Sequence, residues 1–326
     1  MRKYLIAFAA LVMGSGTANA VDSNTVEIVY NGSTATVTVA SNISSYITDA
    51  SNGSSHVKLT QSDNFTGNTI GEITYILSGT STDGEFYLEG SYKCSVELNG
   101  VTLTNPAGPA VNIQNGKRIK VSAKNGTTST LTDGQNDNYN GCLHSKGHTE
   151  FKGKGTINVV GNSKHAIYSK EYMQVKNLTI NITAAQKDGI HCKEYFLIEG
   201  GSVNISGVAD DGIQVELDNG SATTGTTSDH EDENSGNFYM TDGSLAISNY
   251  SGKAIKADGS IKYNGGTRNY DTSDVTENAA SGISHTQNDV EAITRRYNLQ
   301  GRSATTGTSV IIEKNSKRTI KKLNRK

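Results

Sequence analysis

Three aspartates recur at a spacing that could bring them together around a metal ion. Asp188 and Asp211 lie 23 residues apart, each is followed by Gly and Ile, and Asp210 directly precedes Asp211. If 23 residues form one turn of a repeating structure, the two lie on adjacent turns, about 4.8 Å apart. Ca²⁺ takes about six to eight oxygen ligands and accepts carboxylates. We therefore expect a calcium site at Asp188, Asp210 and Asp211.

Without a cation, this acidic group is unfavourable. Two carboxylates at that spacing repel each other by roughly 3–4 kcal/mol at an effective dielectric near 20. The same repeat brings Lys187 and Lys253 close to the acids, and their ammonium groups could offset the repulsion instead. The residues alone leave three solutions open: calcium, compensation by lysine, and a solvated acidic patch.

A second periodic set of polar residues indicates a glycan-binding face. It consists of the residue directly after each apolar strand position and the residue two positions later, which alternate outward along a strand. These residues are Tyr168, Lys170, His191, Lys193, Gln214 and Glu216. Polysaccharides present repeating hydroxyls and apolar sugar faces, which a periodic row of rings, amides and ammonium groups matches in kind. A solvated sheet face without a ligand is the alternative.

The apolar residues indicate the architecture that would align these side chains. Ile167, Ile190 and Ile213 follow one another at intervals of 23 residues, and the next step, to Ile255, is 23 plus an insertion of 19. A fixed period in this range marks a solenoid, in which each turn stacks on a copy of itself.

The strand segments show which solenoid this is. Segments such as Thr179 to Ile182 and Ser202 to Ile205 alternate polar and apolar residues, so one face packs inward and the other meets solvent. Short strands joined by Gly and Asn corners predict an all-β fold, a right-handed parallel β-helix. The low hydrophobic share of 34% fits the thin core that such a fold buries.

Two further columns follow from the same period. Tyr172 and Tyr195 recur at equal positions, with Phe238 as their expected continuation, and serve either for stacking on sugars or for buried stacking at a corner. A column of side-chain amides should stabilise the stack; its members are Asn158, Asn181 and Asn204. Cys94, Cys142 and Cys192 lack the spacing of a disulfide scaffold or a zinc site and are expected to be buried free thiols.

The ends of the chain carry different signals. Residues 1–20 have the basic, apolar and small-residue pattern of a cleaved signal peptide, and Asn31-Gly32 is a hairpin signal. In chain order, the predicted parts are the signal peptide (1–20), a β cap with the first coils (21–97), the β-helix domain (98–266) with an insertion loop (218–236), a linker (267–288) and a short basic tail (289–326).

Charge and hydropathy narrow the partners. The net charge is only -2, but the basic residues concentrate in the tail, so the rest of the chain is acidic. An acidic body argues against nucleic acid and favours cations or neutral polymers. After the signal peptide, no apolar run approaches the roughly 20 residues of a membrane span. We expect an exported protein.

The motifs resemble one known family. The resemblance covers roughly residues 25–270 and is carried by Leu98 to Lys120, Lys187-Asp188-Gly189-Ile190-His191 and Asp210-Asp211-Gly212-Ile213-Gln214. These segments resemble the bacterial carbohydrate-binding-domain β-helix proteins, which look like pectate lyases in shape. That family is associated with calcium-dependent binding of cellulose-like and acidic polysaccharides. The resemblance therefore implies that Asp188, Asp210 and Asp211 are calcium ligands, while the motif departs at His165-Ala166 and Lys253-Ala254.

The tail resembles another group of sequences. Tyr297 to Arg302, followed by Val310 to Ile312 and a Lys-rich end, is similar to the C-terminal tails of proteins exported by the type IX route or kept at the surface of some Gram-negative bacteria. The resemblance implies a sorting signal, the secretion machinery as a partner, and an extracellular or outer-surface location. A basic solvated tail is the alternative.

The expected function is therefore calcium-assisted, non-catalytic polysaccharide binding outside the cell. No recognised hydrolase, metalloprotease or phosphate-binding motif occurs. A calcium-dependent polysaccharide lyase stays open, with Lys170 or Lys193 as the base that removes a sugar proton. A surface adhesin or structural solenoid is the other alternative.

Overall fold

The structure is a computed structural model that describes residues 21–67, 70–223, 225 and 232–277, together with the backbone of three strands near the C-terminus. The chain divides into two compact units, Met1–Ile283 and Ser284–Lys326. The predicted signal peptide, most of the predicted linker and part of the insertion loop lie outside the described residues.

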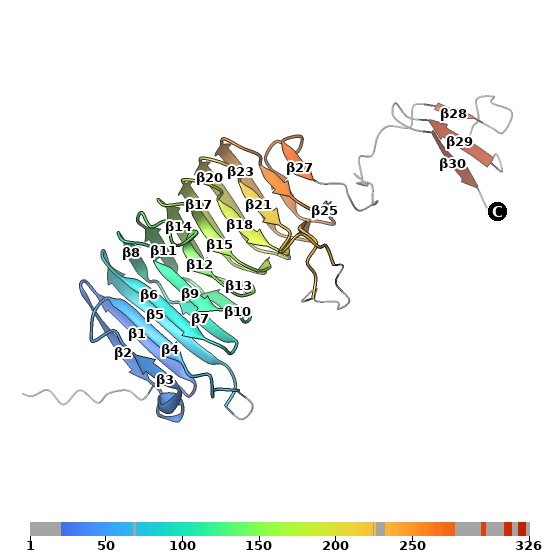
Figure 1. The fold of residues 1–326 in the computed structure, drawn as a ribbon. Helices are drawn as coiled ribbons and strands as arrows, with labels where there is room; N and C mark the ends of the chain where they lie inside the picture. The colour runs from blue at the N-terminus through green and yellow to red at the C-terminus, as the bar shows by residue number, and fades with distance from the viewer. Residues whose placement is uncertain are drawn as a thin grey trace, which may run out of the picture. The chain divides into compact units, whose positions relative to one another are not determined.

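Each turn of the first unit contains three short strands. One turn consists of β15 (His165–Ser169), β16 (Met173–Val175) and β17 (Thr179–Ala185), and the next of β18 (Ile190–Lys193), β19 (Tyr195–Ile198) and β20 (Ser202–Val208). Each strand pairs in parallel with its equivalent in the next turn. Figure 1 shows these turns stacked along one axis. The predicted all-β parallel β-helix is confirmed.

The strands form three rows along this axis. The first row is a ten-stranded sheet that also contains β3 (Ile47–Asp49), β4 (His56–Gln61), β6 (Glu85–Gly90), β9 (Val111–Asn115), β12 (Gly141–Ser145), β21 (Ile213–Glu216), β24 (Ile255–Ala257) and β27 (Val275–Glu277). The second row adds β7 (Cys94–Leu98), β10 (Ile119–Ala123), β13 (Thr149–Gly153), β22 (Asn237–Met240) and β25 (Ile261–Tyr263). The third adds β8 (Thr102–Asn105), β11 (Thr128–Asp133), β14 (Thr156–Gly161), β23 (Ser244–Tyr250) and β26 (Thr267–Asn269).

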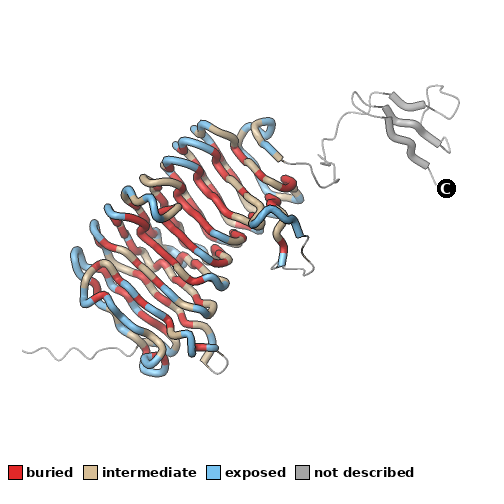
Figure 2. Tube along the Cα trace, viewed as in Figure 1, coloured by how far each residue is buried: buried red, intermediate tan, exposed pale blue. Residues whose placement is uncertain are grey.

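The core is a column of like residues. Ile167, Ile190, Ile213 and Ile255 are register partners on successive turns and are completely buried. In Figure 2 the buried residues gather along the strands and the exposed ones along the corners. The predicted column is confirmed, and it shows that the 23-residue interval corresponds to one turn.

The tyrosine column is buried and ends earlier than predicted. Tyr172 and Tyr195 stack with ring centroids 4.8 Å apart and are fully buried, which settles them as packing residues. The expected continuation at Phe238 is wrong, because Asn237 pairs with Tyr195 and Phe238 pairs with Phe196 in the core. A shift of one residue reverses the face of a strand.

Two other predictions are confirmed. The Asn181 side-chain amide donates to Asn158 Oδ1 and that of Asn204 donates to Asn181 Oδ1, both at 2.9 Å. These bonds join adjacent turns and stabilise the stack. All three cysteines are free and buried.

The N-terminal end of the stack is closed by antiparallel strands. β1 (Thr25–Asn31) pairs in parallel with β5 (Ile73–Ser81) and antiparallel with β2 (Thr34–Val39). The predicted hairpin after Asn31 is present, and Gly32 takes a φ of +64° at its turn, where glycine is favoured. After the short 3₁₀ helix η1 (Ser41–Tyr46), β3 pairs antiparallel with β4. Such a cap covers edges that would otherwise pair with other chains.

The second unit contains its own small sheet. β29 (Val310–Lys314) pairs antiparallel with both β28 (Arg295–Tyr297) and β30 (Thr319–Leu323). The segment predicted only as a basic tail therefore includes three strands. No helix among the described residues has the length and apolar character of a membrane-spanning segment.

The core column predicts a mutational response. Ile190→Ala should lower the free energy of unfolding by about 2–5 kcal/mol, because it removes buried groups from a column that cannot collapse easily. The exposed Thr183 on the same turn provides a control, and Thr183→Ala should change stability by less than about 0.5 kcal/mol. Urea denaturation measures both, and equal small losses would contradict the stacked core.

Candidate metal centre and surface grooves

The aspartates stand at a corner where the backbone needs hydrogen-bond acceptors. Between the third row and the first row of the next turn, one side chain per turn accepts the N–H of the equivalent residue on the following turn. Asp188 N–H donates to His165 Nδ1 at 3.3 Å, Asp211 N–H to Asp188 Oδ1 at 3.1 Å, and Lys253 N–H to Asp211 Oδ1 at 2.7 Å. An acceptor side chain at this position therefore joins each turn to the next.

The structure brings the three predicted metal ligands together. Carboxylate oxygens of Asp188, Asp210 and Asp211 all lie within 4.8 Å of one another. Asp188 and Asp211 are buried, whereas Asp210 is exposed, and its carboxylate has no hydrogen bond or ion pair with another described residue. These oxygens form a group that could bind a metal ion.

Gly252 leaves the space that this arrangement needs. A Cβ atom at position 252 would lie 2.3 Å from Asp211 Oδ1 and 2.8 Å from Asp210 Oδ1. Any other residue would therefore collide with two of the carboxylates. The sequence shows the glycine but not that it faces the acids.

The charges around the aspartates differ from those expected. Burial would raise the pKa of Asp188, but hydrogen bonds from His165 and His191 lower it below its usual range. Burial raises the pKa of Asp211, and the neighbouring charges of Asp188 and Asp210 raise it further, against the opposing hydrogen bond from Lys253 N–H. The acidic group thus keeps unrelieved repulsion at Asp211.

Lysine compensates only in part, and through a residue that we did not predict. The Lys253 ammonium pairs with Asp274 at 2.7 Å, and no ion pair joins Lys187 to an acid within the described ranges. Lys256 instead lies 3.6 Å from Asp211 Oδ2. The expected role of the Lys187 and Lys253 side chains is therefore wrong.

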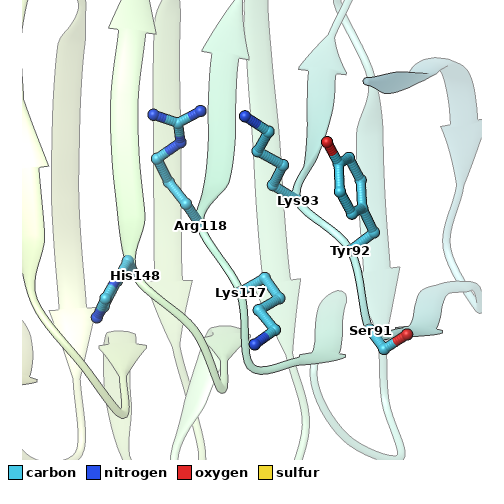
Figure 3. Close-up of a pocket in the computed structure, with 6 residues that line it drawn as sticks. All are labelled: Ser91, Tyr92, Lys93, Lys117, Arg118 and His148. Carbon is cyan, nitrogen blue, oxygen red and sulfur yellow. The ribbon is translucent and has the colours of Figure 1, made fainter. Parts of the chain in front are cut away.

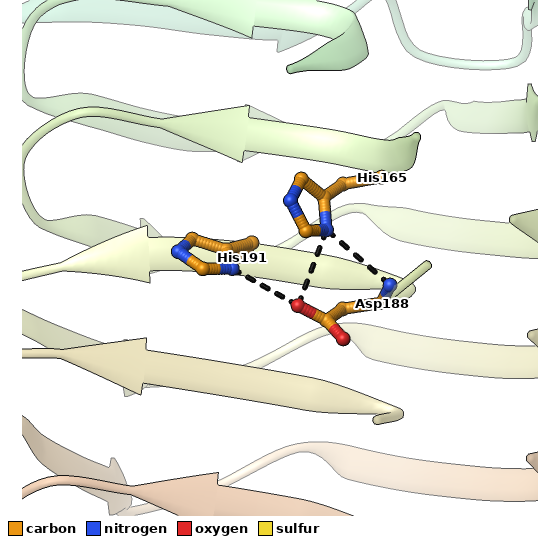
Figure 4. Close-up of side chains that lie close together, drawn as sticks. All are labelled: His165, Asp188 and His191. Carbon is orange, nitrogen blue, oxygen red and sulfur yellow. Dashed lines mark hydrogen bonds and ion pairs between the residues drawn. The ribbon is translucent and has the colours of Figure 1, made fainter. Parts of the chain in front are cut away.

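Two histidines converge on Asp188. His191 Nδ1 lies 2.9 Å and His165 Nδ1 lies 3.1 Å from Asp188 Oδ2 (Figure 4). His191 Nε2 lies 3.4 Å from Glu216 Oε2. The repeat places His165 and Asp188 in one column, but nothing in the sequence shows that His191 turns back toward the corner.

The residues of the predicted glycan face are in register but only partly accessible. Tyr168, His191 and Gln214 are partners on successive turns, and Lys193 is the partner of Glu216. Tyr168 and His191 are only 8% exposed, and their ring centroids lie 5.5 Å apart. The rings cover each other, so their faces are not free for a sugar.

The accessible part of this face is a polar edge. Lys170 is exposed, Lys193 Nζ pairs with Asp218 at 3.1 Å, and the Gln214 amide donates to Glu216 Oε1 at 2.8 Å. Through His191, which contacts both Asp188 and Glu216, this edge is continuous with the acidic group.

A second surface feature is an uncharged groove across β14, β17, β20, β23 and β26. Its volume is about 670 Å³, and it runs over several turns between Thr130 and Tyr270. The amide ladder at Asn158, Asn181 and Asn204 lines it, and none of its lining residues is charged. Ala246 follows Asn204 in register, so the ladder is interrupted there by a small side chain.

A third feature is a smaller pocket of about 310 Å³ near β7, β10 and β13 (Figure 3). It is lined by Ser91, Tyr92, Lys93, Lys117, Arg118 and His148. Acids balance most of these cations: Glu72 lies 3.5 Å from Lys93 and 3.0 Å from Arg118. His148 contacts Glu171 at 3.0 Å and Glu194 at 3.3 Å. The pocket is a compensated ionic network.

Parallel strands stacked in three rows, with grooves on their faces and carboxylates at one corner, define a parallel β-helix shaped like polysaccharide lyases. The chain belongs to the family of carbohydrate-binding domain-containing proteins, whose sequence profile matches residues 66–321.

One relative and one solved structure illustrate the likeness. A carbohydrate-binding domain-containing protein of Acetivibrio thermocellus is 25% identical over 111 residues, which cover 31% of this chain and 39% of the relative, so this chain spans well under two thirds of that protein. A polysaccharide lyase-like protein from C. thermocellum, solved as a gadolinium derivative, is 19% identical with a TM-score of 0.58, covering 78% of this chain and 98% of that one. At this identity the likeness establishes the fold.

The ionic network predicts a pH-dependent stability. Burial would lower the pKa of His148, but its hydrogen bonds with Glu171 and Glu194 raise it to about 9. A raised histidine pKa gives stabilisation that is complete below the unfolded value of about 6.5 and is lost as the pH rises through about 9. Wild type should therefore melt higher than His148→Gln near pH 6, and this difference should disappear above about pH 9.

A second histidine provides the control. The pKa of His144 falls to about 4, because burial and the charges of Lys146 and Lys164 disfavour protonation. His144→Gln should therefore leave the stability difference between pH 6 and pH 9.5 as in wild type. Thermal melts across this range decide the matter, and a His148→Gln difference that does not shrink would contradict the assigned charge.

Proposed function

We propose that this chain is a non-catalytic polysaccharide-binding protein that holds Ca²⁺ at Asp188, Asp210 and Asp211. The observation that carries the proposal is the convergence of three carboxylates from adjacent turns within 4.8 Å. Membership of the carbohydrate-binding family supports polysaccharide as the ligand.

The donor set favours calcium. All three side chains offer oxygen, the ligand atom that Ca²⁺ prefers, and a cation would relieve the repulsion that raises the pKa of Asp211. Asp210 is exposed without a described partner, and Gly252 leaves space beside it. Calcium would neutralise the acids and offer open coordination positions to the oxygens of an acidic glycan.

The polar edge would receive the glycan beside the metal. His191 links Asp188 to Glu216, and Lys193 lies on the same strand. In this proposal Lys170, Lys193, Gln214 and Glu216 contact the sugar, while Tyr168 and His191 support them from beneath. The repeat along the axis suits a polymer with its own repeat.

The location and the domain boundaries are part of this proposal. Residues 1–20 support export, and the C-terminal segment supports retention at, or release from, the outer surface of a Gram-negative bacterium. The second unit would then act as the element recognised by the secretion machinery, and the unit of residues 21–277 as the binding domain.

The metal proposal predicts opposite behaviour for matched variants. Calcium at about a hundredfold excess over its Kd should stabilise the protein by about 2.7 kcal/mol, a rise of several degrees in Tm. Asp210→Asn and Asp211→Asn should abolish the rise, because each removes a ligand charge, whereas the exposed Asp137→Asn should retain it. The rise should also shrink at acidic pH, where protons compete at Asp211. Calcium titrations by differential scanning fluorimetry measure these shifts, and an unchanged rise in both variants would place the ion elsewhere.

The same proteins test the glycan. Polygalacturonate in an affinity gel should retard wild type with calcium but not with chelator, and should not retard Asp210→Asn. Lys256 lies beside Asp211, where a base of a calcium-dependent lyase would stand. Rising absorbance from unsaturated sugar ends would therefore replace the binding proposal with a lyase. Absence of retardation by any glycan would favour an adhesin or structural solenoid.

The uncharged groove is a second glycan surface in this proposal. Its amides and hydroxyls can exchange hydrogen bonds with sugar hydroxyls, and the absence of charge among its lining residues suits a neutral, cellulose-like chain. The groove runs along the axis, so consecutive sugars would meet equivalent groups on consecutive turns.

A groove-filling substitution tests this surface. Ala246→Trp should reduce retention by hydroxyethyl cellulose at least tenfold without lowering Tm, because it places a large side chain in the groove. Thr102→Trp is the matched control: Thr102 belongs to the same row and is exposed, but it does not line the groove. Affinity electrophoresis compares them, and equal retention of both variants and wild type would exclude the groove.

A further inference from the structure

We propose that His165, Asp188 and His191 form a second metal site, which takes a transition-metal ion of the zinc type and not calcium. The site lies at the corner before β18, and its residues come from two adjacent turns. It shares Asp188 with the calcium site but uses a different set of neighbours.

The three ligand atoms converge in a buried place. His165 Nδ1 and His191 Nδ1 lie 3.1 Å and 2.9 Å from Asp188 Oδ2, and one ligand atom of each residue lies within 4.8 Å of the others. The side chains of both histidines are 10% exposed and that of Asp188 is 1% exposed. Figure 4 shows both rings turned toward the carboxylate.

These separations are close to those of a tetrahedral zinc site. Metal–nitrogen and metal–oxygen distances of about 2.0–2.1 Å place neighbouring ligand atoms about 3.3 Å apart. The observed 2.9 Å and 3.1 Å differ from this by a few tenths of an ångström. Small rotations of the two rings would therefore admit an ion.

The hydrogen bonds of the three residues alone do not satisfy His165. Its Nδ1 lies 3.3 Å from the Asp188 backbone nitrogen and 3.1 Å from Asp188 Oδ2. A ring nitrogen either donates or accepts. As a donor, it leaves the Asp188 N–H without this acceptor; as an acceptor, it directs a lone pair at the carboxylate. A cation between Nδ1 and Oδ2 would remove that repulsion.

The surroundings already hold the rings as metal ligands are usually held. His191 Nε2 lies 3.4 Å from Glu216 Oε2, and metal-binding histidines commonly donate their other ring N–H to a carboxylate. This contact directs the Nδ1 lone pair of His191 toward the proposed ion. The His165 ring packs against His191 at 4.5 Å between centroids, which limits its rotation.

The donor set separates the two metals. Two imidazole nitrogens and one carboxylate suit Zn²⁺ and related ions, whereas calcium requires oxygen. Asp188 Oδ2 faces the histidines, and Asp210 and Asp211 lie on the other side of the same group. His165 and His191 therefore belong to one site only, and Asp210 to the other only.

This separation gives the test, on untagged protein stripped of metal. Zn²⁺ should raise Tm and bind in calorimetry, and Co²⁺ should give the visible absorption of a tetrahedral complex. His165→Gln and His191→Gln should weaken zinc binding at least tenfold and abolish the cobalt spectrum, while the calcium-induced rise in Tm remains. Asp210→Asn should lose the calcium effect and retain the zinc effect.

Glutamine is chosen because its side-chain oxygen can still accept the Asp188 N–H, and His191→Asn provides a second variant if His165→Gln does not fold. His56→Gln on β4, at a histidine remote from the site in sequence, is the control and should bind zinc as wild type does. Zinc binding that is absent in wild type, or unchanged in both site variants, would overturn the proposal. Neither result depends on whether calcium binds, so this site and the proposed function fail independently.

Discussion

The structure depends on one constraint: backbone hydrogen bonds join each 23-residue turn to the next in register. Because of this pairing, an interval along the chain becomes a step of about 4.8 Å along the axis. Ile167, Ile190 and Ile213 form a core column for this reason. The same constraint aligns the asparagine amides and brings Asp188 beside Asp211.

The candidate metal centre is part of this pairing and not an addition to it. Asp188 and Asp211 each use one carboxylate oxygen to accept an N–H of the following turn. The fold therefore requires acceptor side chains where the chemistry requires ligands. This coupling explains how buried carboxylates are tolerated at a corner, since each is held by a backbone donor as well as by its neighbours.

The columns could be predicted from the sequence because stacking preserves the period, and they include the isoleucines, the amides and the aspartates. What happens at corners and insertions could not be predicted. Phe238 faces the core because the alternation of its strand, not the period, decides its face. His191 contacts Asp188 by a local bend, and Lys256 replaces Lys253 beside Asp211 because a long side chain reaches across a turn.

The most direct measurement is an anomalous difference map from a crystal grown with terbium as a calcium substitute. The account predicts superposed Ile167, Ile190 and Ile213, and a strong peak with oxygens of Asp188, Asp210 and Asp211 at about 2.3–2.6 Å, the range of calcium ligands. A peak bound elsewhere, with these carboxylates left to solvent, would contradict the assignment of the metal centre.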